Sequence, residues 1–524
     1  MFPRVLLVVI DGATPRIVCP LVRTGHFPVL ARLAEAGTMH EASVTIFPSI
    51  TPAATTSILT GAYPAEHGIA GASWYDAARG EIAYYGDDFW VIAREGFGEF
   101  VRDFLLRLNG DRLTAPTLFE IVERTGKRAA CLNYLVFRGT SAHRVAMPKL
   151  LSTLPGVPLT ETVEGPSLLS LGDFVGPRTA GGRKLSEKGG LFHRFGMDDA
   201  STAAMLRDLM AERSLPDFTV AYFPDNDYRS HELGPSGALP VIAAVDRMLG
   251  EAFEAGGGLE RVLSDTWVII TSDHGHCEIR PDAAAAIHLD AILHDFRQAA
   301  LGRPWQAGDE ILICPNMRAA QIYLAAATAE SVERVAAAAL ADPRIDLAIW
   351  RAGPDPDDGY VVVSSRGRVT FRRANGVSST RAGRAGDAFG TIWSWEGELA
   401  VLDLIDDGGV LYDGQYPNPF ERIANALDLE KSGDVWLTAE PGCEFQVPGG
   451  EAHRGGGSHG ALHALDSHSP VIVAGPERMT LPRAMRSVDL APLCTSLLGM
   501  SMRYAVGQPR GPVMSGRVRD TGAR

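Results

Sequence analysis

Continuous apolar runs alternate along the chain with amphipathic segments that are rich in Ala and Leu. The clearest runs are residues 5–10 (VLLVVI), 267–271 (WVIIT) and 471–474 (VIVA). Runs that are apolar on both faces are typical of central strands in a parallel sheet, because helices cover such a sheet on both sides. The alternation of runs and amphipathic segments therefore predicts an α/β fold with a mostly parallel sheet.

Three segments between the apolar runs carry signals of helices. Residues 52–60 begin with a proline and end at Gly61, which is the usual order of the residues that start and stop a helix. Residues 240–255 form a second helical stretch, and residues 329–341 form a third, which Thr328 is placed to cap. We therefore expect three helices at these positions.

Two stretches depart from this alternation. Residues 152–200 are rich in Gly, Pro and Ser and predict a long excursion over the surface. A later stretch has a mixed pattern of its own, in which YVVVSS and RVTF form a hairpin-like pair around Gly367. The expected organisation is a discontinuous α/β core of residues 1–295 and 435–505, an inserted α+β cap of residues 296–434, and a loose C-terminal tail of residues 506–524.

Composition and charge narrow the class of protein. The 524 residues are 46% hydrophobic and 21% charged, as in an ordinary folded protein, and the formal net charge of −14 disfavours a nucleic-acid polymer as partner. The six cysteines contain no CxxC pair, so we expect buried thiols in a reducing compartment. The N-terminal apolar run is too short for a membrane span or a signal segment. We therefore expect a cytoplasmic protein with no membrane partner, and the oligomeric state stays open.

Side chains that bind metals lie next to apolar runs or glycine-rich turns at four places. Because the carboxyl ends of parallel strands meet at one edge of a sheet, we expect these side chains to gather there. Carboxylates and imidazoles together suit Zn²⁺, whereas an all-oxygen set would indicate Mg²⁺ or Ca²⁺. Two divalent ions about 4 Å apart would clamp the attacking and leaving oxygens of a phosphoryl displacement. The candidate ligands are Asp11, Asp227, His231, Asp273, His274 and His459.

Thr51 is the candidate nucleophile. It directly precedes Pro52, at the expected N-cap of a helix, where free backbone N–H groups and the helix dipole face an incoming phosphate. A metal ion touching the threonine oxygen would lower the pKa of the hydroxyl and make an alkoxide accessible. Thr45, Thr55 and Thr56 are weaker candidates, because Thr45 precedes the turn and the other two lie inside the expected helix.

Five stretches resemble the alkaline phosphatase superfamily and, within it, the type I phosphodiesterase/nucleotide pyrophosphatase family. They are VVIDG, TPAATTSILTGAYPAEHGI, DNDYRSHELGP, TSDHG and GGSHG, and SVDLAPLCTSLLG resembles the closing helix of the superfamily. The stretches follow the order of the family from residue 5 to residue 499, so the resemblance covers nearly the whole chain. It implies an alkaline-phosphatase-like three-layer sandwich, with a mostly parallel central sheet and the inserted α+β cap.

The resemblance also implies a two-zinc site. The residues that match the ligands of one ion are Asp11, Thr51, Asp273 and His274, and those that match the ligands of the other are Asp227, His231 and His459. The reaction of the family is a two-step displacement through a phosphothreonine, here on Thr51, which water then hydrolyses. The expected substrate is a small anionic phosphate ester with a phosphodiester or pyrophosphate bond.

Two positions depart from the family pattern. Ala54 stands three residues after the nucleophile, where nucleotide pyrophosphatases usually carry an Asn that holds a phosphate oxygen. Backbone N–H groups or another side chain must hold that oxygen here. The family also often places an Asp directly after Pro, which here is Asp225, but the spacing of four residues to His231 selects Asp227. Asp225 is then expected to support the site from outside the ligand set.

Several other residues have a structural interpretation beside a functional one. We expect His67 to be structural, and the remaining candidates to support the ligands or to face solvent, namely His276, His453, His463 and His468. Trp74 and Tyr75 would form an apolar wall for a leaving group, or would simply pack. A sulfatase is rejected, because the segment CPLVR at 19–23 places its proline one position early and lies outside the nucleophile segment.

Two alternative functions remain open. One is hydrolysis of a phosphonate or a phosphomonoester at the same metal site. The other is a catalytically idle metal-binding protein, against which the intact set of ligands and the threonine argue. The inserted cap is expected to set specificity, and it carries no known recognition motif.

Overall fold

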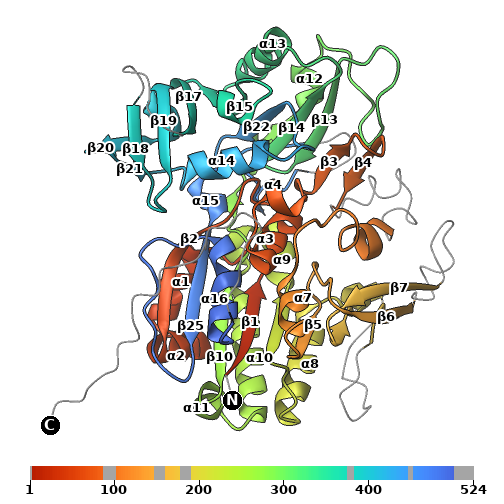
Figure 1. Ribbon diagram of the computed structural model, residues 1–524, viewed down its shortest axis with the longest axis vertical. Coiled ribbons are helices and arrows are strands. Elements are labelled where there is room, and N and C mark those ends of the chain that lie inside the picture. The colour runs from red at the N-terminus through yellow and green to blue at the C-terminus, as the bar shows by residue number, and fades with distance from the viewer. Residues whose placement is uncertain are drawn as a thin grey trace.

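The chain builds two large sheets, which lie in different halves of the molecule (Figure 1). The computed structural model describes residues 3–85, 102–146, 160–176, 191–374, 383–446 and 452–500. The expected C-terminal tail of residues 506–524 lies outside the described residues, as does part of the expected surface excursion of residues 152–200.

The first sheet has seven strands and is mostly parallel, as predicted. Their order is β2 (Thr38–Val44), β25 (His468–Ala474), β10 (Thr266–Thr271), β1 (Arg4–Ile10), β9 (Phe218–Phe223), β5 (Ala129–Leu132) and β8 (Leu168–Ser170). The strands from β10 to β8 are parallel to one another. The apolar run at 471–474 was expected among the parallel strands, but β25 is antiparallel to both of its neighbours. The reason is that the preceding chain reaches the carboxyl edge of the sheet, so the strand must start there.

Helices cover this sheet on both faces. Alternate residues of β1 enter two different hydrophobic cores, with Leu7 and Val9 in one and Leu6 and Val8 in the other. The first core includes residues of α3 (Thr51–Thr60), α7 (Leu118–Glu123) and α16 (Leu490–Leu497). The second core includes residues of α1 (Pro15–Arg23), α2 (Pro28–Ala36), α8 (Asp199–Ala211), α10 (Leu239–Ala255) and α11 (Leu259–Leu263). The chain thus forms the expected three-layer sandwich.

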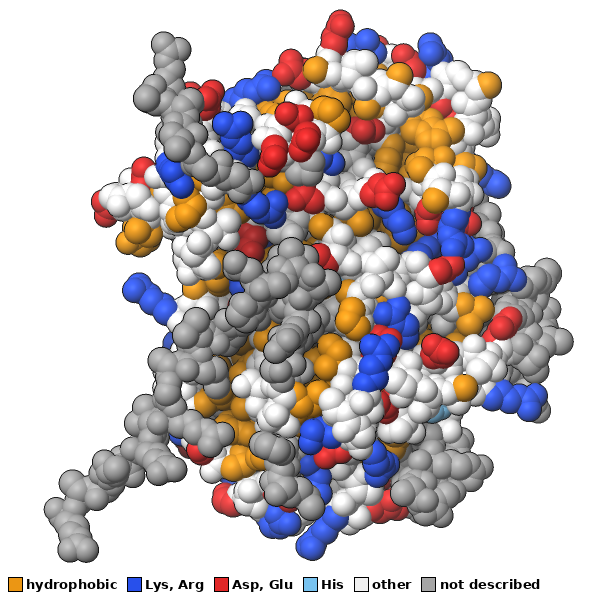
Figure 2. Space-filling view, viewed as in Figure 1, with side chains coloured by type: hydrophobic (Ala, Val, Ile, Leu, Met, Phe, Trp, Pro, Cys, Tyr) orange, Lys and Arg blue, Asp and Glu red, His pale blue; other side chains and the backbone are white. Residues whose placement is uncertain are grey.

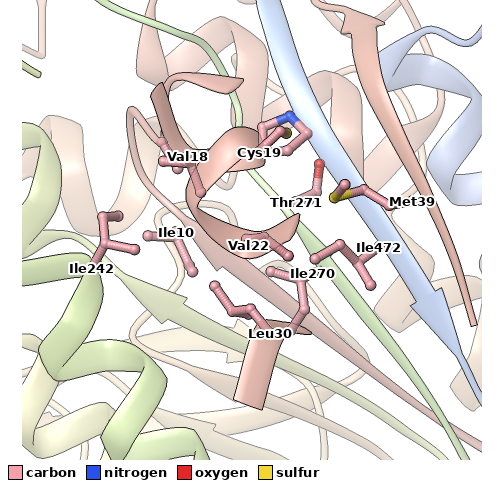
Figure 3. A pocket seen from close by; sticks show the side chains of 12 residues that line it. Ile10, Val18, Cys19, Val22, Leu30, Met39, Ile242, Ile270, Thr271 and Ile472 are labelled. Carbon is pink, nitrogen blue, oxygen red and sulfur yellow. The ribbon is translucent and has the colours of Figure 1, made fainter. Parts of the chain in front are cut away.

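A narrow void lies in the second core, between α1, α2 and the sheet (Figure 3). Its volume is about 10 Å³, which is at most the space of one water molecule, and apolar side chains such as Val18 and Ile270 line it. Cys19 also faces this void, so the CPLVR segment lies in α1 and contributes to the core. The void is a feature of core packing, since its lining offers too few polar groups to bind a ligand.

The second sheet has ten strands. Their order is β13 (Ile311–Asn316), β14 (Ala319–Leu324), β22 (Val435–Ala439), β15 (Ile345–Arg351), β16 (Tyr360–Ser364), β17 (Gly367–Arg373), β19 (Ile392–Gly397), β18 (Gly383–Gly386), β21 (Val410–Asp413) and β20 (Leu404–Asp407). The helices α12 (Leu289–Ile292) and α13 (Ala329–Leu340) pack on one face, and α14 (Pro419–Leu427) packs on the other. Since β22 lies between β14 and β15, this sheet extends past residue 434, where the cap was expected to end.

The hairpin expected around Gly367 is confirmed. Strands β16 and β17 are antiparallel, and Ser364 pairs with Gly367 across the turn. The helix expected at 240–255 is α10, and the helix expected at 329–341 is α13. The side chain of Thr328 caps α13 by accepting a hydrogen bond from the backbone N–H of Ser331.

The helix expected at 52–60 is α3, which begins one residue earlier. Thr51 is therefore the first helical residue rather than the N-cap. The N-cap is Ile50, whose backbone is extended and whose carbonyl accepts the first hydrogen bond, from the N–H of Ala54. The expected stop is confirmed, because Gly61 adopts the left-handed conformation with φ of 67°.

Short elements complete the described part of the fold. The two-stranded pairs are β3 (Ser73–Asp76) with β4 (Glu81–Tyr84), β6 (Ser141–Ala146) with β7 (Thr160–Gly165), β11 (Cys277–Glu278) with β24 (Gly457–Ser458), and β12 (Ala286–Ile287) with β23 (Glu444–Phe445). The other α-helices of the described residues are α4 (Pro64–His67), α9 (Asp225–Gly237) and α15 (Ala464–Ser467).

Candidate metal centre

Three neighbouring strands of the central sheet carry candidate ligands at their carboxyl ends. Asp11 follows β1, Asp273 and His274 follow β10, and Asp227 lies in the first turn of α9, directly after β9. Because β10, β1 and β9 are adjacent and parallel, these side chains meet at one edge of the sheet. The arrangement expected from the sequence is therefore present in the structure.

His459 reaches the same edge from a distant part of the chain. It follows β24, which pairs with β11 so that Ser458 lies opposite Cys277. This pairing stacks the rings of His459 and His274, whose centroids are 3.6 Å apart.

One group of donor atoms surrounds the Nε2 atom of His274. The Oδ1 atom of Asp11 lies 3.5 Å from it, and the Oδ2 atom of Asp273 lies 3.4 Å from it. The hydroxyl oxygen of Thr51 lies 3.0 Å from the same nitrogen. The four residues that were expected to share one ion are thus brought together.

A second group of donor atoms surrounds Asp227. Its Oδ2 atom lies 3.4 Å from Nε2 of His231, one turn later on α9, and its Oδ1 atom lies 3.6 Å from Nε2 of His459. Asp227 also belongs with Asp11 and His274 to a set whose donor atoms all lie within 4.8 Å of one another. The two groups therefore share Asp227 and form one continuous cluster.

The cluster fits a divalent cation. Three buried atoms that could donate a lone pair to a metal ion have no hydrogen-bond partner among the described residues. They are Oδ1 of Asp11, Oδ2 of Asp273 and Nε2 of His459. Uncompensated burial of such atoms is costly. Ligands at about 2.0–2.1 Å in a tetrahedral arrangement lie about 3.3 Å apart, close to the separations of 3.4–3.5 Å between carboxylate and imidazole atoms here. The carboxylate and imidazole set could thus hold a metal ion.

Backbone carbonyls orient the three candidate histidine ligands in the same way. The Nδ1 atom of His231 lies 2.8 Å from the carbonyl oxygen of Gly457, and Nδ1 of His459 lies 2.8 Å from that of Ser49. Nδ1 of His274 lies 3.2 Å from the carbonyl oxygen of Gly275. Donation from Nδ1 to a carbonyl leaves Nε2 of each ring as the free lone pair that a metal requires.

The charges of the cluster favour a cation. Burial raises the pKa of Asp11 well above its usual range, and repulsion from Asp273 and Asp227 raises it further. Burial lowers the pKa of His459 well below its usual range, and the neighbouring His274 adds to this effect. A bound cation would stabilise both the charged carboxylate and the neutral imidazole.

Asp225 lies outside the cluster and has a structural role. Its backbone N–H donates to Oδ1 of Asp199 at 3.0 Å, and its Oδ2 atom accepts from the N–H of Asp199 at 3.3 Å. Asp225 also forms an ion pair with Arg194. This exchange caps the first turns of α8 and α9, and it leaves Asp227 as the carboxylate that faces the candidate metal site.

Two histidines outside the expected ligand set adjoin the proposed ligands, and one of them, His276, has a donor atom within 4.8 Å of those of Asp227, His231 and His459. His276 is fully buried, and its Nε2 atom lies 2.7 Å from Oδ1 of Asp227. The ring of His453 packs on that of His231, with centroids 4.1 Å apart, and its Nδ1 atom lies 2.8 Å from Oε1 of Glu444. The DHGH spacing placed His276 near the site, but its contact with Asp227 depends on how β9 and β10 are placed in the sheet.

The weaker nucleophile candidates on α3 are bonded within the helix. The hydroxyl of Thr55 donates to the carbonyl of Thr51, and the hydroxyl of Thr56 donates to that of Pro52. Thr45 is buried away from the helix start, in the strand-like segment before α3. Thr51 is thus the threonine of this segment whose hydroxyl faces the cluster.

The two aromatic residues after α4 pack against other rings. Trp74 has no exposed surface and stacks on Tyr85 at a centroid distance of 5.4 Å. Tyr75 contacts the rings of Trp305 and Tyr323 edge-on. A contact between these residues and a leaving group stays a prediction.

The structure thus places an Asp/His cluster and a threonine at the carboxyl edge of the central sheet of an α/β sandwich, an arrangement that could hold metal ions for phosphoester hydrolysis. Residues 5–375 match the sequence model of the type I phosphodiesterase/nucleotide pyrophosphatase family. The chain therefore belongs to that family.

Solved structures share the fold over nearly the whole chain. Phosphonoacetate hydrolase from Sinorhizobium meliloti 1021, in complex with phosphonoformate, is 18% identical, with a TM-score of 0.54, covering 95% of this chain and 96% of that one. Human ectonucleotide pyrophosphatase/phosphodiesterase 5 is 16% identical, with a TM-score of 0.54 and coverage of 96% and 97%. An inactive murine form of the latter protein, in complex with AMP, is 14% identical, with a TM-score of 0.55 and coverage of 97% of each chain.

A search of curated protein sequences finds no match to the chain. In the part of the chain that the structure describes, every helix is too short or too polar to cross a bilayer. All six cysteines are buried and none forms a disulfide bond, as expected from their spacing.

Proposed function

We propose that this protein hydrolyses phosphodiester or pyrophosphate bonds in a small anionic substrate, with Thr51 as the nucleophile. The observation that carries the proposal is the position of the Thr51 hydroxyl, 3.0 Å from Nε2 of His274 at the start of α3. A buried group of three carboxylates lies beside it. The family to which the chain belongs supports phosphoester hydrolysis in general.

The proposed ligands of one zinc ion are Asp11, Thr51, Asp273 and His274, and those of the other are Asp227, His231 and His459. When bound, these ions would neutralise charge on the phosphoryl oxygens and lower the pKa of the Thr51 hydroxyl. The donor set supports zinc, because it mixes carboxylate with imidazole.

The start of α3 holds the phosphoryl group in this proposal. The first helical hydrogen bond runs from the N–H of Ala54 to the carbonyl of Ile50, so the N–H groups of Thr51 and Ala53 precede it. Such groups and the helix dipole attract anions. They would take the part of the amide side chain that Ala54 lacks.

Thr51 then carries the covalent step. Its hydroxyl gives up its proton and its oxygen forms a bond to phosphorus, while the bond from phosphorus to the leaving oxygen breaks and the leaving group takes up a proton or departs as an anion, which gives a phosphothreonine. Water attacks the phosphothreonine in the second step and regenerates the hydroxyl. The fixed position of Thr51 on the first turn of a buried helix supports this role, because in-line displacement requires a well-placed nucleophile.

The test compares Thr51→Ala with Thr60→Ala on bis(p-nitrophenyl) phosphate. Thr60 is the matched control, because it is a buried threonine of the same helix whose hydroxyl donates to the carbonyl of Thr56. We expect T51A to lose activity by about 10³-fold or more and T60A to retain most of it. Acid quenching during turnover should trap one phosphoryl group on the peptide that contains Thr51. Full activity of T51A would contradict the proposal.

Hydrolysis of a phosphonate or a phosphomonoester is the second candidate. It is favoured by the fold shared with a phosphonoacetate hydrolase over 95% of this chain, and by Ala54, which removes the amide typical of nucleotide pyrophosphatases. Rates on bis(p-nitrophenyl) phosphate, p-nitrophenyl phosphate and phosphonoacetate separate the candidates. A faster rate on phosphonoacetate or on the monoester would replace the diester proposal, and turnover of none of them would favour an idle binding protein.

A further inference from the structure

His276 contacts the candidate metal centre differently from the three histidines proposed as ligands. Those three place Nδ1 against a backbone carbonyl and leave Nε2 for the cluster. His276 instead uses Nε2 toward Oδ1 of Asp227, and its buried Nδ1 atom has no hydrogen-bond partner among the described residues. Its ring is therefore oriented by Asp227 and not by the backbone.

The distance between the two atoms indicates a hydrogen bond rather than a shared metal ion. Nε2 of His276 and Oδ1 of Asp227 are 2.7 Å apart, which is typical of a charge-assisted hydrogen bond. Two ligands of one tetrahedral ion lie about 3.3 Å apart. The 3.4 Å between Asp227 and His231 fits that second value, so His231 and His276 relate to Asp227 in different ways.

The backbone of His276 is fixed by the segment that follows Asp11. Its N–H donates to the hydroxyl of Thr14 at 3.0 Å, and its carbonyl accepts from the guanidinium of Arg16 at 3.2 Å. Gly12, with φ of 63°, leaves the room that the imidazole needs, because a Cβ atom there would lie 2.6 Å from Nε2 of His276. The position of His276 is thus built into the same loop that presents Asp11.

The other two carboxylates of the cluster each use one oxygen for a hydrogen bond within the protein and keep the other oxygen without one. Asp11 accepts a hydrogen bond from the hydroxyl of Tyr222 at Oδ2, and its Oδ1 atom is unpartnered within the described chain. Asp273 accepts at Oδ1 from the N–H groups of Gly12 and His274, and among the described residues its Oδ2 atom has no partner. In each case the protein holds one oxygen and leaves the other for the site.

We propose that His276 is a positioning residue, which donates its Nε2–H to Oδ1 of Asp227 so that Asp227 binds a metal ion through Oδ2 alone. This role rests on the proposed function, since it requires a metal ion at Asp227, His231 and His459. A carboxylate that binds through one oxygen leaves a coordination position open, and a hydrolytic site needs such a position for substrate or water. Loss of the hydrogen bond would free Asp227 to bind through both oxygens.

The test uses the full-length protein stripped of metal and titrated with Co²⁺, which replaces Zn²⁺ and absorbs visible light according to its coordination number. His276→Met removes the donor and keeps most of the side-chain volume, whereas the amide of His276→Gln keeps a donor near the position of Nε2. We expect H276M to bind Co²⁺ at least about 10-fold more weakly and with a weaker absorption, as for a higher coordination number. H276Q should stay close to the wild type in both measurements.

His67→Gln is the matched control, because His67 is fully buried but bonded to Ser57 and Ile69, outside the cluster. It should leave the Co²⁺ spectrum unchanged. If H276M does not fold, His276→Asn takes its place, since the shorter amide does not reach Asp227.

The outcomes separate this role from the proposed function. If the wild type binds no Co²⁺, the proposed function and the role of His276 both fail. If the wild type binds Co²⁺ and H276M matches it, only the role of His276 fails. If H276Q loses affinity and changes the spectrum as much as H276M, His276 is itself a ligand and the positioning role is wrong.

Discussion

At the scale of single residues, some buried polar atoms of this protein have hydrogen-bond partners within the fold and others do not. His67 is buried, and its partners are complete. Its Nδ1 atom accepts from the N–H of Ile69 at 3.1 Å, and its Nε2 atom lies 3.0 Å from the hydroxyl of Ser57. The carboxylates Asp11 and Asp273 each keep one buried oxygen without a partner among the described residues. The first arrangement is structural, as expected for His67, and the second is one that could bind a cation.

The neutral state of His67 predicts how stability depends on pH. Burial lowers the pKa of His67 to about 3, whereas the unfolded chain titrates near the ordinary value of about 6.5. Between these two values the unfolded state takes up a proton that the folded state does not. The free energy of unfolding therefore falls as the pH drops below about 6.5, by up to about 1.4 kcal/mol per pH unit for this residue.

Urea unfolding of wild type and His67→Gln at several pH values between 4 and 7, with a chelator present, measures this dependence. The variant should be less stable at pH 7, because it loses the Nδ1 acceptor of the Ile69 N–H, but its stability should fall less steeply with acid. His468, whose pKa burial lowers to about 4, contributes equally to both proteins. Parallel pH profiles would show that His67 is not the group responsible.

At the scale of elements, helix α14 joins the two halves of the molecule. All of its residues are buried, and Arg422 extends from it into the interface between the two halves, which we call the seam. The guanidinium of Arg422 donates to the carbonyls of Ile46 and Leu462 and to the hydroxyl of Ser467. Ile46 lies shortly before α3, so the second sheet is bonded to the segment that carries Thr51. The polar residues of α14, Glu421, Arg422 and Asn425, are all buried, and the hydrophobic pattern of the sequence does not predict this.

Replacement of Arg422 tests this seam. Arg422→Met removes the buried donors and leaves several carbonyls without partners, so we expect a loss of about 3 kcal/mol or more in the free energy of unfolding. Arg368→Met is the matched control, because Arg368 is half exposed and pairs with the exposed Glu333. It should change stability by less than about 1 kcal/mol. Equal effects of both variants in urea unfolding would show that the seam does not depend on Arg422.

At the scale of the whole molecule, the negative charge is distributed unevenly. Basic and acidic side chains are interspersed over the described surface of the face in Figure 2. The site itself gathers three buried carboxylates, and their mutual repulsion contributes to the raised pKa of Asp11. Two divalent ions would reverse this local charge, so the metal-loaded site would attract a small anion although the net charge of the chain is −14.

Removal of metal should therefore destabilise the protein. We expect chelation to lower the melting temperature and added Zn²⁺ to restore it, since an ion at 1,000 times its dissociation constant stabilises the folded state by about 4 kcal/mol. Asp227→Asn should lose much of this response, whereas Asp225→Asn should keep it, because Asp225 caps helices outside the cluster. A melting temperature that does not respond to chelator and Zn²⁺ in the wild type would contradict a metal centre.

Local features of the sequence determined most of the fold class and the candidate ligands that gather at the carboxyl edge of the sheet. Apolar runs such as residues 5–10 specify buried strands, because burial on both faces requires apolar side chains at every position. The order of strands along the chain then places Asp11, Asp227 and Asp273 at one edge, since parallel strands end together. Helix starts and stops at Gly61 and Thr328 follow from the backbone preferences of single residues.

Only the tertiary structure decided the features that depend on contacts between distant segments. The direction of β25, the membership of β22 in the second sheet and the hydrogen bond from His276 to Asp227 are of this kind. Residues 227 and 276 are 49 positions apart, and their separation of 2.7 Å depends on how β9 and β10 flank β1 and on the loop at Gly12. Hydrophobic periodicity records which face of an element is buried but not which partner covers it, and packing in three dimensions makes that choice.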